Sequence, residues 1–385
     1  MKFIHTGDWH IGKIVNEFHM TEDQDYILSQ LLNLLQEERP DALVIAGDIY
    51  DRSVAPVEAV ELLDRIFCRI TLDLNIPILA IAGNHDSPER VGFGSSLLYS
   101  KGLYIEGVLK KEVSKVVLED QYGPVSFYLM PYADPAVVRE LYEDKEIKSH
   151  EDAVRTIVEN INKNRDINER SVMIYHGFVV GGEEPETSES ERPLSIGGTE
   201  YVKAENFSTF SYTALGHLHG PQRVGNDNIR YSGSLLKYSF TEVNHKKGVT
   251  IVNLDQEGKA EIEHRELIPK RDLRKIKGDL QELIKPEVYQ GTNREDYINV
   301  ILTDEGELID PIGKLRAVYP NIMQLTRENS VKREEKTKTA PGEDFKMKSK
   351  LELFGDFYMG ITGKELNEEK IKILSHIIEE VEKEE

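Results

Sequence analysis

Short, mostly apolar runs recur along the chain, and most of them stop at a glycine or a polar residue. A run of this length between turn-forming residues is typical of a buried strand. Five of the runs lead, directly or through one glycine, into Asp, Asn or His, and they cover residues 3–6, 42–46, 78–82, 172–175 and 212–215. We therefore expect five buried strands that deliver polar side chains to the carboxyl edge of a sheet.

Between the first strands, apolar residues are spaced three or four apart, as on one face of an α-helix. Residues 27–35 carry such a face, which stops before Pro40 and follows a possible capping box, Thr-Glu-Asp-Gln at 21–24. A second helix is expected to start at Pro56. Its expected inward-facing residues are Val57, Val60, Leu63 and Phe67. This alternation predicts a largely parallel central sheet.

The alternation continues to about residue 268. Further strands are expected at 125–130, around 229 and at 248–254, and further helices at 134–142 and 151–161. Because the late strands are separated by short turns, we expect them to build a second, mixed sheet. Two sheets packed face to face with helices outside give a four-layer α/β/β/α fold for residues 1–268. Residues 178–201 lose periodicity, and we expect a mobile surface loop there, as a disordered insertion rather than a gate.

The pattern changes from about residue 269. A helix over 273–283, a strand at 297–302, a helix at 312–318 and a strand at 322–325 are expected to form a small α/β module, 269–326. Residues 327–350 are charged and poor in large apolar side chains, which is typical of a linker.

Two amphipathic helical pieces are expected in residues 351–385. Their apolar faces need a cover, which is either the chain's own domain or, as we favour, a groove on a partner protein. The residues expected to contact that partner are Phe354, Phe357, Tyr358, Leu374 and Ile378.

Composition bounds the class of protein. The chain has 385 residues, of which 39% are hydrophobic and 30% charged, so a globular protein of more than one domain is expected. No apolar run is long enough for a membrane span, and Met1 leads directly into the first strand. We expect a cytoplasmic protein. Cys68, the single cysteine, excludes an internal disulfide and is expected in the core.

The formal net charge of −21 argues against a general affinity for nucleic acid. Much of the acidity lies in residues 183–191 and at the C-terminus, so a DNA contact would have to be local, metal-mediated or shared with a partner. One basic run, residues 270–277, could contact phosphates or could be a solvated helix face. Its basic residues are Lys270, Arg271, Arg274, Lys275 and Lys277.

The polar residues after the five strands suggest a metal centre. They supply carboxylate, amide and imidazole donors without thiolate, which suits Mn²⁺, Fe²⁺, Zn²⁺ or Mg²⁺. After any single strand, a cap or turn former is the simpler explanation, but five strands together favour a site. Two ions about 3.5–4 Å apart need one bridging ligand, and a carboxylate has two oxygens for it. Asp48 is the candidate bridge.

These residues also resemble a known signature. The motifs DWH, GDIYD, GNHD, HG and GHLH, in this order, are similar to those of calcineurin-like metallophosphoesterases. The resemblance implies one ion held by Asp8, His10, Asp48 and His219, and a second held by Asp48, Asn84, His176 and His217. It makes His85 the catalytic histidine beside the ions. Asp86 would orient His85 or a ligand, or else cap the helix ahead of Pro88.

Over its whole length, including YSGS at 231–234, the chain resembles SbcD-type nucleases. This resemblance implies a Mn²⁺-dependent exo- and endonuclease that acts on DNA in the nucleoid. It also implies a partner, an SbcC-type ABC ATPase with coiled coils, and a homodimer within a 2:2 complex. The dimer would form through helices around 56–67 and 87–98, and residues 269–326 would be the capping domain.

Two other functions compete with a nuclease. A phosphatase or cyclic-nucleotide phosphodiesterase would use the same ions and motifs, and a scaffold would have lost the chemistry. The additional module and helices after residue 269 favour the nuclease, because a small-molecule phosphatase has no evident use for them. The presence of every ligand type disfavours the scaffold.

Overall fold

The computed structural model describes residues 1–192, 194, 201–304 and 306–328, and, near the C-terminus, residues 351, 354, 355, 358, 359, 366, 370–375, 377 and 378. The chain divides into two compact units. The first comprises Met1–Lys275, Gly291–Asn299 and Tyr319–Met323, and the second Ile276–Gln290, Val300–Val318 and Gln324–Glu385. The expected boundary at 268/269 stays a prediction. The expected linker lies outside the described residues from position 329 on.

The first sheet has six strands in the order β16-β15-β1-β4-β5-β6. The strands are β1 (Lys2–Thr6), β4 (Ala42–Ile45), β5 (Ile78–Ile81), β6 (Leu103–Glu106), β15 (Gly248–Leu254) and β16 (Ala260–Glu266). Strands β1, β4, β5 and β6 are parallel, as expected for the first three from their buried apolar runs, whereas β6 was not predicted. We expected 248–254 in the second sheet, and this was wrong. Strand β15 pairs antiparallel with β1, because the first strand has an edge that the parallel crossovers leave open.

The second sheet also has six strands, in the order β13-β14-β12-β9-β8-β7. The strands are β7 (Ser114–Asp120), β8 (Gly123–Met130), β9 (Ser171–His176), β12 (Tyr212–Gly216), β13 (Gln222–Val224) and β14 (Asn226–Tyr231). Its four central strands are parallel, and β7 and β13 close the two edges antiparallel. The sheet is therefore mixed, as predicted.

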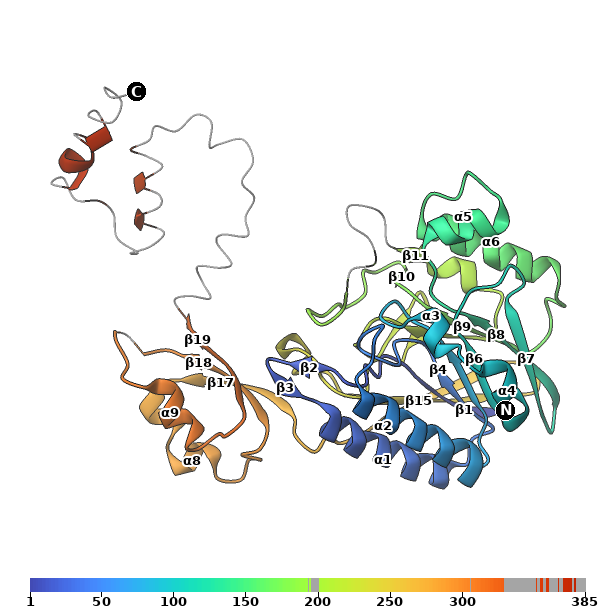
Figure 1. Cartoon of the computed structure of the whole chain (residues 1–385), viewed down its shortest axis with the longest axis horizontal. Coiled ribbons are helices and arrows are strands. Elements are labelled where there is room, and N and C mark those ends of the chain that lie inside the picture. Colours follow the sequence, from blue (N-terminus) through green and yellow to red (C-terminus); the bar gives the residue numbers. More distant parts are fainter. Residues whose placement is uncertain are drawn as a thin grey trace. The chain divides into compact units, whose positions relative to one another are not determined.

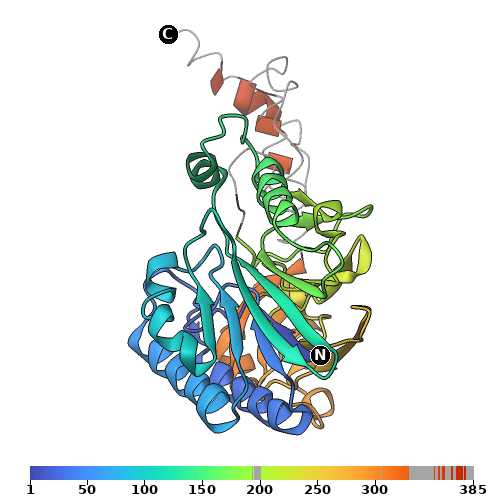
Figure 2. The same cartoon turned by 90° about the vertical axis from the view of Figure 1, so that its right-hand side faces the viewer.

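Three apolar layers hold the two sheets and their helices together. The layer between the sheets contains Phe3, whose ring meets Phe127 and Tyr212 edge-on at 5.6 Å. The outer layers lie under α1 (Thr21–Glu38) and α2 (Val57–Cys68) on one side and under α6 (His150–Lys163), beside α5 (Pro135–Tyr142), on the other. Figures 1 and 2 show these two helix pairs on opposite sides of the sheets. The predicted four-layer α/β/β/α fold is confirmed.

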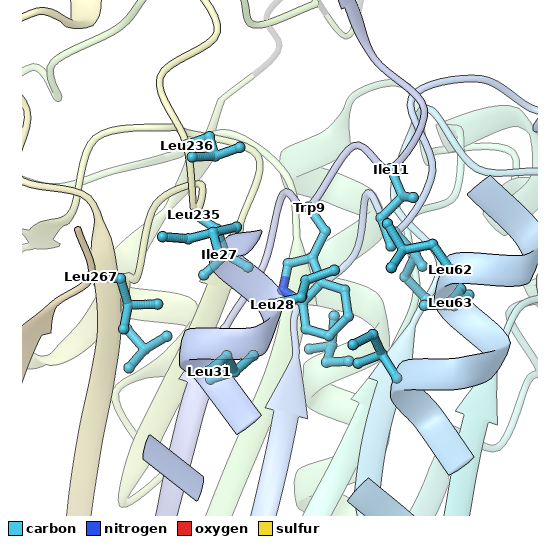
Figure 3. Close-up of a cluster of buried hydrophobic side chains, with 14 of the residues drawn as sticks. Trp9, Ile11, Ile27, Leu28, Leu31, Leu62, Leu63, Leu235, Leu236 and Leu267 are labelled. Carbon is cyan, nitrogen blue, oxygen red and sulfur yellow. The ribbon is translucent and has the colours of Figure 1, made fainter. Parts of the chain in front are cut away.

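Trp9 anchors the loop after β1 in the layer beneath α1 and α2. Figure 3 shows its indole between residues of α1, such as Leu28, and residues of α2, such as Leu62. The side chain is 1% exposed, and its indole N–H donates to Thr6 Oγ1 at 3.0 Å. A buried side chain of this size fixes the backbone on either side of it. Asp8 and His10, the residues on either side of Trp9, therefore belong to a backbone segment that is held rigidly in place.

Three local expectations about helices were wrong. Thr21 is already helical, the N-cap is Met20, and its side chain makes no capping bond. In α2, Val57 and Val60 are 71% and 47% exposed, because the buried face is centred on residues one or two positions away. That face consists of Ala59, Leu62, Leu63, Ile66 and Phe67. Cys68 is exposed, since it follows buried Phe67 by about 100° around the helix.

The C-terminal module contains a three-stranded sheet in the order β17-β18-β19. We expected one helix over 273–283, but residues 273–278 form a strand. Exposed Lys275 and Lys277 alternate there with more buried neighbours, which is the two-residue period of a strand. Its elements are β17 (Leu273–Gly278), α7 (Leu280–Leu283), α8 (Pro286–Tyr289), β18 (Tyr297–Leu302), α9 (Pro311–Arg316) and β19 (Ile322–Arg327).

The remaining elements are short. They are β2 (Ile14–Val15), β3 (Phe18–His19), η1 (Arg69–Asp73), α3 (Pro88–Val91), α4 (Ser95–Leu98), η2 (Tyr99–Lys101), β10 (Val179–Val180), β11 (Val202–Lys203), η3 (Ala204–Phe207) and η4 (Phe240–Glu242). Among the described residues, no helix combines the length and the apolar character that crossing a membrane requires.

Candidate active site

The loops that follow β1 and β4 run side by side at the edge of the first sheet. Asp8 N–H donates to the Gly47 carbonyl at 3.0 Å, and His10 N–H donates to the Asp48 carbonyl at 2.9 Å. Asp8, His10 and Asp48 all have positive φ, between 46° and 53°. This backbone conformation is uncommon outside glycine and persists where surrounding contacts enforce it. The paired loops thus turn three candidate ligands toward one point.

The second sheet touches these loops with the ends of β9 and β12. His217 N–H donates to Asp8 Oδ1 at 2.8 Å, and His176 Nδ1 donates to the Ala46 carbonyl at 2.9 Å. Gly216 makes this approach possible, because a Cβ there would collide with the Ala46 carbonyl oxygen. The two sheets therefore contribute to one site.

Asp48 and Asn84 lie among the imidazoles of both sheets. Asp48 Oδ2 is 3.5 Å from His176 Nε2 and 3.6 Å from His10 Nε2. Asn84 Oδ1 is 2.8 Å from His176 Nε2 and 3.3 Å from His217 Nδ1. Asp48 thus has one oxygen near His10, which follows β1 of the first sheet, and near His176, which ends β9 of the second, as a bridging ligand needs.

His219 and Asp8 complete the cluster. The Nε2 atoms of His219 and His10 are 3.0 Å apart, and donor atoms of both lie within 4.8 Å of an Asp8 oxygen. A second group within the same limit consists of Asp8, Asp48 and His176. All seven residues predicted as metal ligands come together at one place.

The electrostatics of this cluster suit bound cations. Burial lowers the pKa of His10 and His217 well below the usual value, so that both imidazoles are neutral, as ligands must be. Burial, with the nearby Asp48 charge, raises the pKa of Asp8. The Asp8 Oδ2 atom is buried without a hydrogen-bond partner. Divalent ions would satisfy these lone pairs and offset the repulsion between the carboxylates.

His85 lies beside the cluster and is half-buried. Its ring meets the His10 ring edge-on at a centroid distance of 4.7 Å. Its Nδ1 donates to the Asp51 carbonyl oxygen at 2.8 Å, so Nε2 is the nitrogen that can exchange a proton. Its backbone N–H donates to Asp48 Oδ1 at 2.9 Å. Donor atoms of His10, Asp51 and His85 also lie within 4.8 Å of one another.

Asp51 was not singled out as a site residue from the sequence. Its carboxylate accepts from Lys13 Nζ at 2.6 Å and lies 3.6 Å from His10 Nδ1. The ion pair with Lys13 gives this carboxylate a partner of its own. Its position as the last residue of the GDIYD motif is the feature of the sequence that could have identified it as a site residue.

Asp86 joins the loops after β4 and β5. Its carboxylate accepts from Ile49 N–H at 3.1 Å, from Tyr50 N–H at 2.9 Å and from Gly83 N–H at 2.9 Å. The alternative of a helix cap was wrong, because Ser87 is the N-cap of α3 and Asp86 points back to β4. Burial, then repulsion from Asp48, raises the Asp86 pKa to about 7.

Comparison with known families covers both parts of the chain. Residues 1–221 match the family model for calcineurin-like phosphoesterases. Residues 269–360 match the SbcD_C model, described as the type 5 capsule protein repressor C-terminal domain. A curated relative, the SbcD subunit of the nuclease SbcCD of Staphylococcus epidermidis, is 38% identical over 326 residues, which is 85% of each chain. The chain belongs to the SbcD family.

Membership makes this SbcD-family chain a metal-dependent hydrolase that acts on phosphodiester bonds. Similar solved structures are remote. A protein of Thermus thermophilus is 12% identical with a TM-score of 0.38, covering 68% of this chain and 98% of its own. A dimetal phosphatase from Danio rerio is 11% identical with a TM-score of 0.40, covering 70% and 96%.

Sequence reasoning missed a segment that docks on the GHLH motif of this SbcD-family chain. Ser190 Oγ lies 2.6 Å from His219 Nδ1, and Glu191 Oε1 accepts from His219 N–H at 2.8 Å. We expected a disordered insertion over 178–201. The hydrogen bonds argue against disorder for residues 186–191, whereas 193 and 195–200 lie outside the described residues.

Four of the five basic residues in 270–277 are paired with carboxylates. Lys270 pairs with Glu22, Arg271 with Glu22 and Asp23, Arg274 with Asp296, and Lys277 with Glu328. Among the described ion pairs, none involves Lys275. Arg271 and Arg274 are the least exposed of the paired four and face the buried carboxylates of Asp23 and Asp296. Their charge is therefore largely committed within the protein.

The residues expected to contact a partner are only partly described. Phe354 is 41% exposed, and Tyr358, Leu374 and Ile378 are half-buried. Phe357 lies outside the described residues. The neighbouring Ile373 and Ile377 are 56% and 50% exposed, so they present more apolar surface than Leu374 and Ile378.

Proposed function

We propose that this chain is a DNA nuclease that works at two divalent ions, as an exonuclease on duplex ends and an endonuclease on hairpin or single-stranded DNA. The supporting observation is the seven-residue donor cluster, with Asp48 Oδ2 between two imidazoles. One ion would be held by Asp8, His10, Asp48 and His219, and the other by Asp48, Asn84, His176 and His217. The mixed nitrogen and oxygen donors suit Mn²⁺ as well as Fe²⁺, Zn²⁺ or Mg²⁺, and we propose Mn²⁺.

When bound, such ions supply positive charge at the phosphate and make a water nucleophilic near neutral pH. Hydrolysis forms a bond from that water oxygen to phosphorus and breaks the bond to the 3′-oxygen, which leaves with a proton. In its doubly protonated form, His85 can provide this proton from Nε2 while its Nδ1–H stays bonded to the Asp51 carbonyl, and it is left as the neutral imidazole. The hydrogen bond from its backbone N–H to Asp48 Oδ1 keeps it beside the proposed bridging ligand.

The proposal is tested by incubating the purified chain with Mn²⁺ and end-labelled duplex, hairpin and single-stranded DNA. A chromogenic phosphodiester and a phosphomonoester are assayed in parallel, each with and without EDTA. We expect cleavage of the DNA and the diester, abolished by EDTA. Hydrolysis of the monoester with DNA left intact would support the phosphatase alternative and overturn the nuclease.

We also propose that the basic run contributes to DNA binding through Lys270, Lys275 and Lys277. Lys270 and Lys277 are about half exposed, and an exposed ion pair is worth only about 0–1 kcal/mol, so a phosphate can replace the carboxylate. Arg271 and Arg274 are less available for the reason given above. Affinity that falls steeply with salt would support such contacts.

The C-terminal residues support the proposal of a partner ATPase of the SbcC type, within a 2:2 complex. Described apolar residues such as Phe354, Ile373 and Ile377 are between 41% and 56% exposed. Full burial of an exposed side chain of this kind is worth about 1.5–3 kcal/mol, so covering the exposed part of these residues on a partner would contribute part of that amount for each. The curated relative is itself named as one subunit of a complex.

Deleting residues 351–385 is expected to abolish binding to the ATPase and ATP-dependent duplex cleavage, while Mn²⁺-dependent hydrolysis of small diesters persists. Co-purification of the two proteins at defined stoichiometry measures the first effect. A full-length Ile377→Asp variant should weaken binding without removing chain, because it puts a charge on an exposed apolar position. Full stoichiometry with the truncated chain would place the docking site elsewhere.

A homodimer is proposed through the helical region around residues 56–67 and 87–98. Phe93 and Leu97 are 86% and 83% exposed on α3, α4 and their connection, an unusual exposure for side chains of this size. Phe93→Asp is expected to shift the chain from dimer to monomer at micromolar concentration in sedimentation equilibrium. Ile167→Asp, which charges another exposed apolar residue, is the control. An unmodified chain that sediments as a monomer would contradict the proposal.

A further inference from the structure

Residues 186–191, here called the strap, surround His219 together with the turn at 242–247. Glu191 Oε1 accepts from the His219 N–H at 2.8 Å, and Lys247 Nζ donates to the His219 carbonyl at 2.7 Å. Ser190 Oγ is 2.6 Å from His219 Nδ1. His219 is thus held at its backbone N–H, its carbonyl and one ring nitrogen, and the strap supplies two of these three contacts.

A count of protons assigns the His219 tautomer. Ser190 has one hydroxyl hydrogen, and it donates to Glu242 Oε1. Because that hydrogen is used, Ser190 Oγ must accept at its contact with His219, so Nδ1 carries the proton. His219 then presents the lone pair of Nε2 toward His10 Nε2, 3.0 Å away. This is the tautomer that a metal ligand bound through Nε2 requires.

Glu242 is fixed in turn by a buried ion pair. Lys247 Nζ lies 2.6 Å from Glu242 Oε2 and also donates to Ser234 Oγ at 2.9 Å and to the His219 carbonyl. The exposed fractions of the Glu242 and Lys247 side chains are 0% and 3%. All three ammonium hydrogens of Lys247 have acceptors, so the pair is a fully satisfied anchor for Ser190.

The strap has further contacts with the chain around the site. The backbone N–H and carbonyl of Glu186 bond the Gln222 side-chain amide at 2.9 and 2.8 Å. Glu189 N–H donates to Thr241 Oγ1 at 3.2 Å. Glu191 Oε2 accepts from Ser188 N–H at 2.8 Å, which closes the strap on itself. Its docked position is therefore determined from one end to the other.

We infer that Ser190, Glu191 and Glu242 are positioning residues for His219, and that docking of the strap is coupled to occupancy of the ion that His219 would hold. The inference rests on the proposed function, because it takes His219 as a ligand. Coupling between two binding events is reciprocal. A docked strap should raise the affinity for this ion, and the bound ion should stabilise the docked strap.

Ser190→Ala tests the inference in the full-length chain. It removes the acceptor for Nδ1–H, and we expect about 10- to 100-fold weaker binding of one Mn²⁺, with the other unchanged, in calorimetric titration. Ser190→Thr keeps the hydroxyl and should restore the affinity. Thr187→Ala removes a hydroxyl from an exposed position of the same segment and is the matched control. Unchanged affinity for both ions in Ser190→Ala would overturn the inference.

Hydrogen exchange provides a readout independent of activity. In the unmodified chain, Mn²⁺ is expected to slow exchange of the backbone amides of the strap, and Ser190→Ala should remove this protection. Equal exchange with and without Mn²⁺ in the unmodified chain would contradict the coupling. Glu242→Gln should act like Ser190→Ala, whereas Glu189→Gln, a charge change at an exposed strap residue, should not.

His219→Ala separates failure of the inference from failure of the proposed function. If it loses one ion while Ser190→Ala changes nothing, the ligand set stands and the positioning role fails. If His219→Ala keeps both ions, the proposed ligand set itself is wrong.

Discussion

His85→Ala is expected to slow DNA hydrolysis by about 10²–10⁴-fold while both ions remain bound. The expected loss reflects the missing proton donor for the 3′-oxygen. The ions should remain because the proposed ligands are other residues, and the Nδ1 of His85 is already bonded to the Asp51 carbonyl. Single-turnover cleavage of labelled DNA and elemental analysis of the purified variant measure the two quantities.

The choice of substrate distinguishes two roles for His85. A nitrophenolate leaves without protonation, so a general acid is less important for a nitrophenyl diester than for DNA. A smaller loss on the nitrophenyl diester would indicate proton donation, and equal losses would indicate stabilisation of charge on the phosphate. His19→Ala, at an exposed histidine of β3, is the control for removing an imidazole. Loss of an ion from His85→Ala would make His85 a ligand and contradict the assignment.

Asp48→Ala is expected to lose both ions and to reduce hydrolysis to the background measured in EDTA. The reason is the position of Asp48 Oδ2, 3.5 Å from His176 and 3.6 Å from His10, which belong to the two different proposed ligand groups. Removal of this carboxylate takes a shared ligand and a negative charge from both positions.

His217→Ala is the matched comparison, since His217 belongs to one proposed group and should cost one ion. Elemental analysis gives the number of ions in each variant. Melting curves recorded without metal separate loss of a ligand from loss of the fold. An Asp48→Ala protein that is folded and still holds one ion would show that Asp48 does not bridge.

Local pattern was sufficient for the strands that carry the site. In β1, β4, β5, β9 and β12 an apolar run ends at, or within three residues of, a residue that can bind metal, so one short stretch defines both the strand and the side chain at its end. The paired-sheet fold followed from the alternation of strands and helices. Which face of α2 is buried was harder to predict from the sequence. Neighbouring residues on a helix point about 100° apart, so a shift of one position changes the buried face, and Val57 and Val60 are exposed.

Contacts between distant parts of the chain required the folded structure. Strand β15 joined the first sheet because β1 offered an open edge about 250 residues earlier in the chain. Asp86 bonds the loop after β4, and Ser190 bonds both His219 and Glu242, residues that no sequence spacing relates. The amino-acid sequence alone determined which residues could bind metal, since donor chemistry belongs to the side chain. Which groups hold those donors in place depended on packing, because a hydrogen bond needs its partner within about 3 Å, and only folding sets that distance.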